Sequence, residues 1–179
     1  MKEKNNPIKY YSLTKILLLS DTHSHIDDTM LKYVHQADEI WHAGDIGNLE
    51  VTDKLKLLKP LRAVFGNIDD NTTRMEFPLH NRFLCEAVDV WITHIGGYPG
   101  KYNPVLKNEL INNPPKLFIC GHSHILKVAF DKQNQFLYMN PGAAGLSGFH
   151  QIRTMLRFEI DKDTISKLEI IELGKKFKN

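Results

Sequence analysis

The sequence predicts an α/β protein in which two β-sheets pack face to face with helices on the outside. In the first half of the chain, short apolar runs alternate with helix-like segments, which favours parallel strands joined by crossover helices. The second half contains mainly strand-like segments. A length of 179 residues, 42% of them hydrophobic, is enough for a single domain with a full core.

Five apolar runs bounded by turn residues predict buried strands. They cover residues 16–20, 39–44, 61–66, 88–93 and 116–121. In open α/β sheets, ligands bind beyond the carboxyl ends of the strands. The residues that follow these five runs are therefore the first candidates for a functional site.

Three segments predict helices. In residues 28–34, Asp27 or Asp28 can cap the first turn. Apolar residues between positions 49 and 58 predict a second helix, which ends before Pro60. The third helix begins at Pro104, a favoured first-turn residue, and ends before Pro114.

The remaining strands are predicted in the second half of the chain. Residues 131–134 are suited to a hairpin loop between two of them. The segments are 81–87, 126–130, 135–139, 154–160 and 165–170.

Residues 15–173 are predicted to form the domain. Residues 1–14 are polar and predict a loose extension, and residues 174–179 predict a solvated basic tail. No stretch approaches the roughly 20 apolar residues that cross a bilayer, and the first apolar run is too short for a secretory signal. A net charge of +2 gives no specific nucleic-acid signal.

Cysteine usage favours a cytoplasmic protein. Cys85 and Cys120 are the only thiols, and both lie in strand-like runs. One disulfide between them is an alternative, but two buried free thiols are the preferred interpretation. The sequence leaves open whether the chain forms a homo-oligomer.

Metal-binding residue types follow all five apolar runs. Because the carboxyl ends of these strands are expected to share one edge of one sheet, their side chains should converge. In Asp21-Thr22-His23 and His122-Ser123-His124, extended backbone would place both outer side chains on one face. The candidate metal ligands are Asp21, His23, Asp45, Asn67, His94, His122 and His124.

This donor set predicts two divalent metal ions. Carboxylate, amide and imidazole donors without thiolate suit Mn²⁺ first, with Zn²⁺, Fe²⁺, Ni²⁺ or Mg²⁺ as alternatives. Asp45 is our candidate to bridge the ions. Such a pair can turn a bound water into hydroxide for in-line attack on phosphorus and neutralise the charge that develops.

The motifs resemble those of the calcineurin-like metallophosphoesterases. They are Asp21-Thr22-His23, Gly44-Asp45, Gly66-Asn67, Thr93-His94 and Gly121-His122-Ser123-His124, in this order. With the small size and Asn140-Pro141-Gly142, the chain looks most like the compact bacterial and archaeal phosphodiesterases of that superfamily.

The resemblance implies a four-layer αββα sandwich of two mixed sheets flanked by helices, and a phosphodiesterase that acts on a small phosphoester. Asp45, Asn67 and His94 would be its catalytic residues. One ion would be held by Asp21, His23, Asp45 and His124. The other would be held by Asp45, Asn67, His94 and His122.

One position departs from the pattern. Many members of the superfamily carry a His directly after the Gly-Asn, where it protonates the leaving group, but this chain has Ile68. General acid catalysis typically contributes about 10²–10⁴-fold. Asp69 or His25 are the candidates to replace it, and without a replacement the leaving-group pKa should control the rate.

Several further residues have open roles. His25 could contact phosphate, donate a proton or be a plain loop residue, and His42 is expected beside the site or in the core. Tyr98 and Lys101 lie in a glycine-rich segment expected at the mouth of the site, where they would touch substrate; the alternative is a connecting loop whose aromatics cap the fold. Residues in loop-like segments that are expected to be solvated are His80 and His150.

Two other functions share some of these sequence features. His23-Ser24-His25 is also typical of barrel amidohydrolases, but a (β/α)₈ barrel needs about 250 residues. The second rival is a protein-binding scaffold with little or no hydrolytic activity, as in the metallophosphoesterase-like subunit of retromer, which lacks a full ligand set. The seven candidate ligands in this chain favour hydrolysis.

Overall fold

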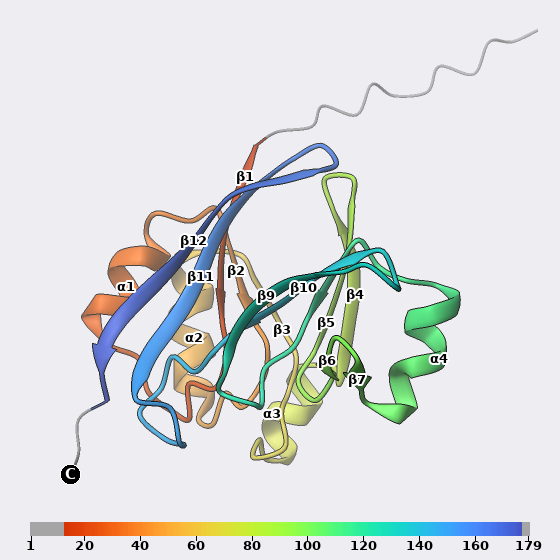
Figure 1. Ribbon diagram of the computed structural model, residues 1–179. Helices are drawn as coiled ribbons and strands as arrows, with labels where there is room; N and C mark the ends of the chain where they lie inside the picture. The colour runs from red at the N-terminus through yellow and green to blue at the C-terminus, as the bar shows by residue number, and fades with distance from the viewer. Residues whose placement is uncertain (1–12, 177–179) are drawn as a thin grey trace, which may run out of the picture.

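The structure is a computed structural model that describes residues 13–176 (Figure 1). Residues 1–12 and 177–179 lie outside the described residues, and with them most of the predicted extension and part of the predicted tail. None of the helices within residues 13–176 is long and apolar enough to cross a membrane.

The first sheet has five strands in the order β12-β11-β1-β2-β3. The three N-terminal strands are parallel, and β11 and β12 are antiparallel to their neighbours. Their bounds are β1 (Thr14–Leu19), β2 (Glu39–His42), β3 (Leu61–Ala63), β11 (Ile152–Asp161) and β12 (Thr164–Lys175).

The second sheet has the order β4-β5-β8-β10-β9. Its three central strands are parallel, and its two edge strands are antiparallel to them. Their bounds are β4 (His80–Cys85), β5 (Val88–Thr93), β8 (Leu117–Ile119), β9 (Leu126–Asp131) and β10 (Phe136–Pro141). The predicted hairpin loop at residues 131–134 joins β9 to β10.

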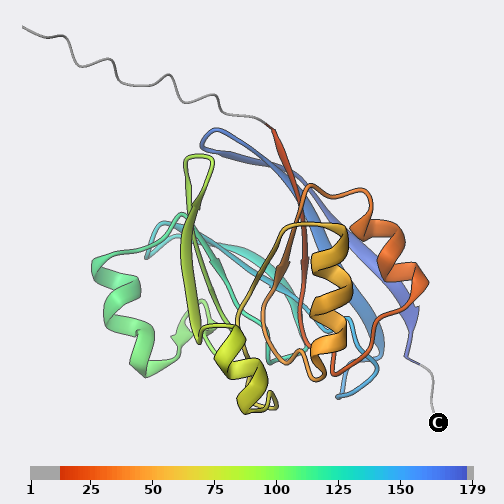
Figure 2. The same ribbon diagram turned by 180° about the vertical axis from the view of Figure 1, so that it is seen from behind.

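Helices cover the outer faces of both sheets. α1 (Asp28–Val34) and α2 (Leu49–Leu58) lie against the first sheet, and α4 (Pro104–Asn112) lies against the second, as Figure 2 shows from behind. All three predicted helices are present. The predicted four-layer αββα sandwich is therefore confirmed.

Three apolar layers hold these elements together. The layer between the sheets is centred on Trp41, whose ring lies 5.2 Å from that of Phe83 and 5.6 Å from that of Phe158. A second layer joins the first sheet to α1 and α2, and a third, which contains Trp91, joins the second sheet to α4. Burial of these apolar faces is the main force that stacks the layers.

Three elements differ from the predictions. α3 (Asn71–Glu76) was not predicted, because its six residues show little apolar periodicity; Asp70 caps it by accepting a hydrogen bond from the Thr73 N–H. β6 (Gly97–Tyr98) and β7 (Lys101–Tyr102) form a small hairpin where a loop was expected. β12 continues into the predicted basic tail, because Lys175 pairs with Ile152.

The cysteines follow the preferred interpretation. Both Cys85 and Cys120 are free and buried. Cys85 packs between the sheets and Cys120 in the layer under α4, so they belong to different apolar layers.

Arg153 ties β11 to the beginning of α1. Its side chain is buried, its Nε donates to the Ala144 carbonyl over 2.7 Å, and its Nη1 lies 2.8 Å from Asp27 Oδ2. Asp27 also caps α1 by accepting from the Met30 N–H over 2.9 Å. Burial raises the pKa of the Asp27 carboxyl, but the Met30 N–H, His25 and Arg153 outweigh this and hold the pKa below its ordinary value of 3.8.

Asp27→Asn tests this pairing. Asn caps helices as well as Asp does, so the change removes the charge and leaves the cap, and Arg153 loses its partner. We expect the free energy of unfolding in urea at about pH 7 to fall by about 2 kcal/mol.

The pH dependence supplies the control. Because the folded-state pKa of Asp27 is lowered, its contribution is complete above the ordinary value of 3.8 and is lost as the pH falls through the folded pKa. The two proteins should therefore become equally stable at lower pH. A difference that persists there would mean that the amide disturbs the cap instead.

Candidate metal centre

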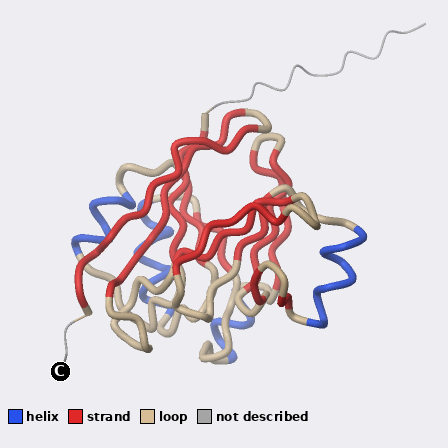
Figure 3. The backbone as a smooth tube through the Cα atoms, in the orientation of Figure 1, coloured by secondary structure: helices blue, strands red, loops and turns tan. Residues whose placement is uncertain are grey.

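The predicted metal ligands lie at the carboxyl ends of β1, β2, β3, β5 and β8. Each of these ends leads into a loop, and Figure 3 shows loops along the lower edge of the sheets. The prediction of one edge of one sheet is wrong, however, because β1, β2 and β3 belong to the first sheet and β5 and β8 to the second. The candidate site is built between the edges of two sheets.

Four of the seven residues form a first group. Their ligand atoms all lie within 4.8 Å of one another. His124 Nε2 is 3.1 Å from Asp21 Oδ1, and His23 Nε2 is 3.7 Å from Asp45 Oδ2. The members of this group are Asp21, His23, Asp45 and His124.

The second group shares Asp45 with the first. Asp45, His94 and His122 have ligand atoms within 4.8 Å of one another. His94 Nε2 lies 3.1 Å from Asp45 Oδ1 and 3.1 Å from Asn67 Oδ1. All seven predicted residues are thus brought together, in the two sets that the resemblance implies. Metal binding itself stays a prediction.

Most of these residues have a left-handed backbone. Such a conformation is uncommon outside glycine and concentrates at functional sites. An extended backbone was predicted for Asp21-Thr22-His23 and for His122-Ser123-His124. This prediction is wrong, because the outer residues of both segments are left-handed. The φ values are 54° for Asp21, 47° for His23, 53° for Asp45, 67° for His122 and 56° for His124.

Two glycines make room for the donors. Gly44 has φ +94°, and a Cβ on it would lie 2.6 Å from His94 Nδ1. A Cβ on Gly66 would lie 2.1 Å from Asp45 Oδ1. Any other residue at these two positions would displace a candidate ligand.

His94 is oriented by the first sheet. Its Nδ1 lies 2.8 Å from the Ala43 carbonyl, to which only an N–H can donate, so Nε2 faces the carboxylates. Such a bond is what holds metal-ligating histidines in place. Burial lowers the pKa of His94, but the hydrogen bond to Asp45 and the charges of both carboxylates outweigh it, so the pKa is raised. Burial likewise opposes ionisation of Asp45, yet His94 holds its pKa below the ordinary value.

His42 supports the site from beneath, in agreement with the expected role. It is completely buried, and burial lowers its pKa to about 4, so the ring is neutral. Its Nδ1 accepts from the Gly44 N–H over 3.2 Å, which leaves Nε2–H to donate to Thr22 Oγ1 over 2.9 Å. Thr22 in turn donates to the Ile46 carbonyl over 3.0 Å. This chain of bonds links the loops after β1 and β2.

Asp69 is not placed as a proton donor. It is buried, and its carboxylate accepts from the N–H groups of Ile46, Gly47 and Gly66 over 3.1, 2.7 and 2.7 Å. Both oxygens are therefore used as acceptors, which argues against Asp69 as the general acid; that role stays a prediction. It fixes the loops after β2 and β3 against each other.

The predicted substrate contacts are less clearly placed. His25 Nε2 lies 3.0 Å from Asp27 Oδ2, so the ring is engaged at the beginning of α1. Tyr98 and Lys101 are exposed on the β6–β7 hairpin, with Lys127 Nζ 4.9 Å from the Tyr98 ring. Tyr102 donates to Asp131 over 2.5 Å and packs on Phe118, as the alternative of a fold-capping aromatic predicts. For His25, Tyr98 and Lys101, contact with substrate stays a prediction.

Three residues near the site have roles that were not predicted. Arg74 on α3 donates to the carbonyls of Asp69 and Asn67 over 2.7 and 3.2 Å. His150 is held by the Gly145 carbonyl over 3.0 Å, and its ring lies 5.3 Å from that of His124, so it is not simply solvated. His80 begins β4, and its Nδ1 lies 2.9 Å from Thr93 Oγ1. Single polar contacts of this kind give no periodic signal in the sequence.

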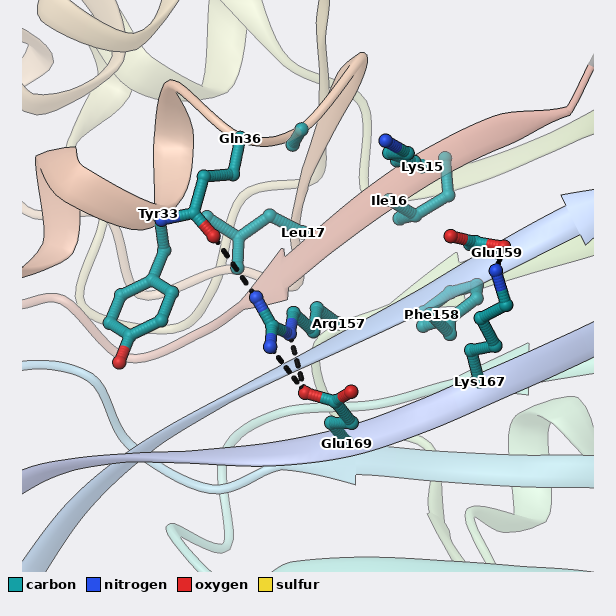
Figure 4. Close-up of a pocket in the computed structure, with 11 residues that line it drawn as sticks. Lys15, Ile16, Leu17, Tyr33, Gln36, Arg157, Phe158, Glu159, Lys167 and Glu169 are labelled. Atoms are coloured by element: carbon teal, nitrogen blue, oxygen red, sulfur yellow. Dashed lines mark hydrogen bonds and ion pairs between the residues drawn. The ribbon is translucent and has the colours of Figure 1, made fainter.

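A cavity of about 420 Å³ outside the first sheet is a separate feature. Figure 4 shows that its charged side chains pair with one another: Arg157 lies 2.5 Å from Glu169, and Lys167 lies 2.8 Å from Glu159. None of the seven candidate ligands lines it. Since these four charged side chains are engaged in ion pairs, we place the chemistry at the metal residues.

Two orphaned atoms test whether the site suits a metal. Asp21 Oδ1 and His23 Nε2 are buried and make no hydrogen bond; their polar neighbours are other candidate ligands, His124 Nε2 at 3.1 Å and Asp45 Oδ2 at 3.7 Å. Leaving such atoms unpaired costs about 1–3 kcal/mol each, more for a charged group. A divalent cation among carboxylates and imidazoles would satisfy both. The residues present therefore fit a metal.

Comparisons with solved structures show the same fold. A single mutant of Vps29 from Entamoeba histolytica is 16% identical with a TM-score of 0.69, over 89% of this chain and 99% of that one. A conserved uncharacterized protein from Streptococcus pneumoniae, a predicted phosphoesterase, is 20% identical with a TM-score of 0.67, over 90% of each chain. An archaeal phosphodiesterase is 22% identical with a TM-score of 0.68, over 89% of this chain and 99% of that one.

A comparison with sequence families goes further than the fold. No curated protein matches the chain. The profile of the calcineurin-like phosphoesterase superfamily domain, in contrast, matches residues 14–163, which include both groups of candidate ligands. The chain therefore belongs to the calcineurin-like phosphoesterase superfamily.

Proposed function

We propose that this protein is a phosphodiesterase that depends on two divalent metal ions, with Mn²⁺ as the first choice. The observation that carries the proposal is the pair of donor groups that share Asp45. Asp21 Oδ1 and His23 Nε2, which are buried and make no hydrogen bond, supply further support. Its substrate would be a small phosphoester, and its place of action the cytoplasm.

Asp45 is suited to bind both ions. Its Oδ1 faces His94 of the second group, and its Oδ2 faces His23 of the first. The Ile68 N–H donates to Oδ1 over 3.1 Å and limits rotation of the carboxylate. When bound, two such ions activate a water for attack and neutralise charge on the phosphoryl group. The protein contributes the fixed positions of the donors.

Asn67 and His94 would be the ligands of the second group that lie next to the substrate. Asn67 is exposed, and its backbone carbonyl accepts from Arg74, which steadies the loop after β3. His94 is fixed by the Ala43 carbonyl. Arg74 adds a positive charge next to this loop, which favours an anionic phosphoryl group.

The position that holds the general acid in many superfamily members has no proton donor in this chain. Ile68 stands where many superfamily members carry a His, and its side chain is apolar. Asp69 is occupied by three backbone N–H groups. Substrates whose leaving groups are weakly basic are therefore favoured, which supports diesters with activated alcohols or phenols.

The rival function is a protein-binding scaffold on the same fold. Vps29 proteins are among the structural neighbours, so the fold alone does not separate the two functions. The complete set of seven converging donors favours hydrolysis, because it supplies ligands for two ions, which is what in-line attack on a phosphoester uses.

The first test of the proposal is Asp45→Asn. An amide has one acceptor oxygen and cannot bridge two cations, so both metal content and Mn²⁺-dependent hydrolysis of bis-(p-nitrophenyl) phosphate should fall, the latter by about 100-fold or more. The matched control is Asp53→Asn on the exposed side of α2, which should change neither. If the purified protein binds no transition metal and Mn²⁺ stimulates no phosphoester hydrolysis, the scaffold function is the correct one.

A second test uses phosphodiesters with leaving groups from nitrophenol to alkyl alcohol. Without a general acid, the rate should fall steeply as the leaving-group pKa rises. A flat profile would show that another acid exists or that chemistry is not rate-limiting.

Asp69→Asn separates structure from acid catalysis. The amide loses acceptor capacity for the three loop N–H groups, so stability should fall by about 1–3 kcal/mol, while the slope against leaving-group pKa stays unchanged. A loss confined to substrates with basic leaving groups would instead restore Asp69 as the proton donor.

A further inference from the structure

An apolar cavity begins at the second donor group. It has a volume of about 320 Å³, and Asn67 and His94 form part of its wall. The rest of the wall comes from the loop after β3, the beginnings of β4 and α4, and the end of β5. Figure 2 shows α3 in yellow and α4 in green on either side of this region. The apolar side chains that line it are Phe65, Leu79, Ile95, Val105 and Leu106.

The polar groups of this wall are already engaged. Asn103 caps α4 by accepting from the Val105 N–H over 3.1 Å and donates to the Ile95 carbonyl over 2.9 Å. His80 and Thr93 are bonded to each other. What the wall offers a ligand is therefore mainly apolar surface.

The wall also exposes large apolar side chains to water. Leu79 is 50% exposed, Ile95 42% and Val105 83%. A contiguous patch of exposed apolar side chains often marks a binding surface in a water-soluble protein. Among the described residues that line the cavity there is no carboxylate, and Arg74 brings a positive charge. A ligand that joins an apolar group to an anion would match both properties.

We propose that this cavity, which we call the ester pocket, binds an apolar ester group of about the size of an aromatic ring, while the attached phosphoryl group lies at the metal residues. The inference rests on the proposed function and names its substrate class: phosphodiesters with at least one aromatic ester group. The pocket is continuous with the candidate metal centre, because Asn67 and His94 belong to both the pocket and the donor groups. A volume of about 320 Å³ lies in the range of small-ligand pockets.

Binding of two phosphonates tests the pocket without relying on turnover. Methylphosphonate and phenylphosphonate carry the same anion, and their C–P bonds are not cleaved by a phosphoesterase. In titration calorimetry with the Mn²⁺-loaded full chain, phenylphosphonate should bind about tenfold more tightly, because its ring removes apolar surface from water.

A pair of matched double variants localises the effect. Leu79→Asn with Val105→Asn places amides in the pocket wall, and the preference for phenylphosphonate should fall to about twofold or less. Leu84→Asn with Ile111→Asn makes the same changes at exposed positions of β4 and α4 that do not line the pocket. This control should keep the full preference.

The outcomes separate the pocket from the proposed function. A phenyl preference that the first variant abolishes and the control keeps supports the pocket, even if no phosphodiester is hydrolysed. Equal affinities, a preference that survives the first variant, or no binding of either phosphonate would overturn it, even if hydrolysis is found. A dimer that dissociates only in the first variant would also overturn it, since the surface would then be an interface between two copies.

Discussion

The candidate site depends on holding the two sheets at one fixed position against each other, because its donors are divided between them. Asp21, His23, Asp45 and Asn67 come from the first sheet, and the other three histidines from the second. Hydrogen bonds between the sheets at the site include those from His94 Nδ1 to the Ala43 carbonyl and from the His122 N–H to Asp21 Oδ2. The apolar layer around Trp41 sets the sheet spacing on which these bonds rely.

Within the first sheet, buried polar groups fix the loops that carry the donors. His42 and Thr22 connect the loops after β1 and β2, and Asp69 connects those after β2 and β3. These residues fix the positions of the donors, and a binding site whose groups are already fixed avoids the free energy of ordering them. The positions of the candidate ligands therefore depend on His42, Thr22 and Asp69, which are not themselves candidate ligands.

The sequence allows the donors to be predicted, and the resemblance allows their two sets, but neither predicts which sheet carries each donor. Apolar runs that end at Asp21, Asp45 and His94 identify strand ends, because strand length and turn residues are local properties. Which sheet each strand joins is decided by pairings distant in sequence, such as β1 with β11, and no local pattern reports it. The hydrogen bonds by which Asp69 connects two loops were not predicted for the same reason, because two of its three partners lie more than 20 residues away in the sequence.

The left-handed backbone at five of the seven donors has a consequence for how this fold can change over time. Each such residue costs roughly 1–2 kcal/mol relative to an unstrained conformation. A descendant freed from binding metal could replace them with glycine or asparagine and gain stability. If related proteins keep these residues despite their conformational cost, selection for activity is indicated. If they carry glycine or asparagine there, loss of the activity is indicated. The positions are Asp21, His23, Asp45, His122 and His124.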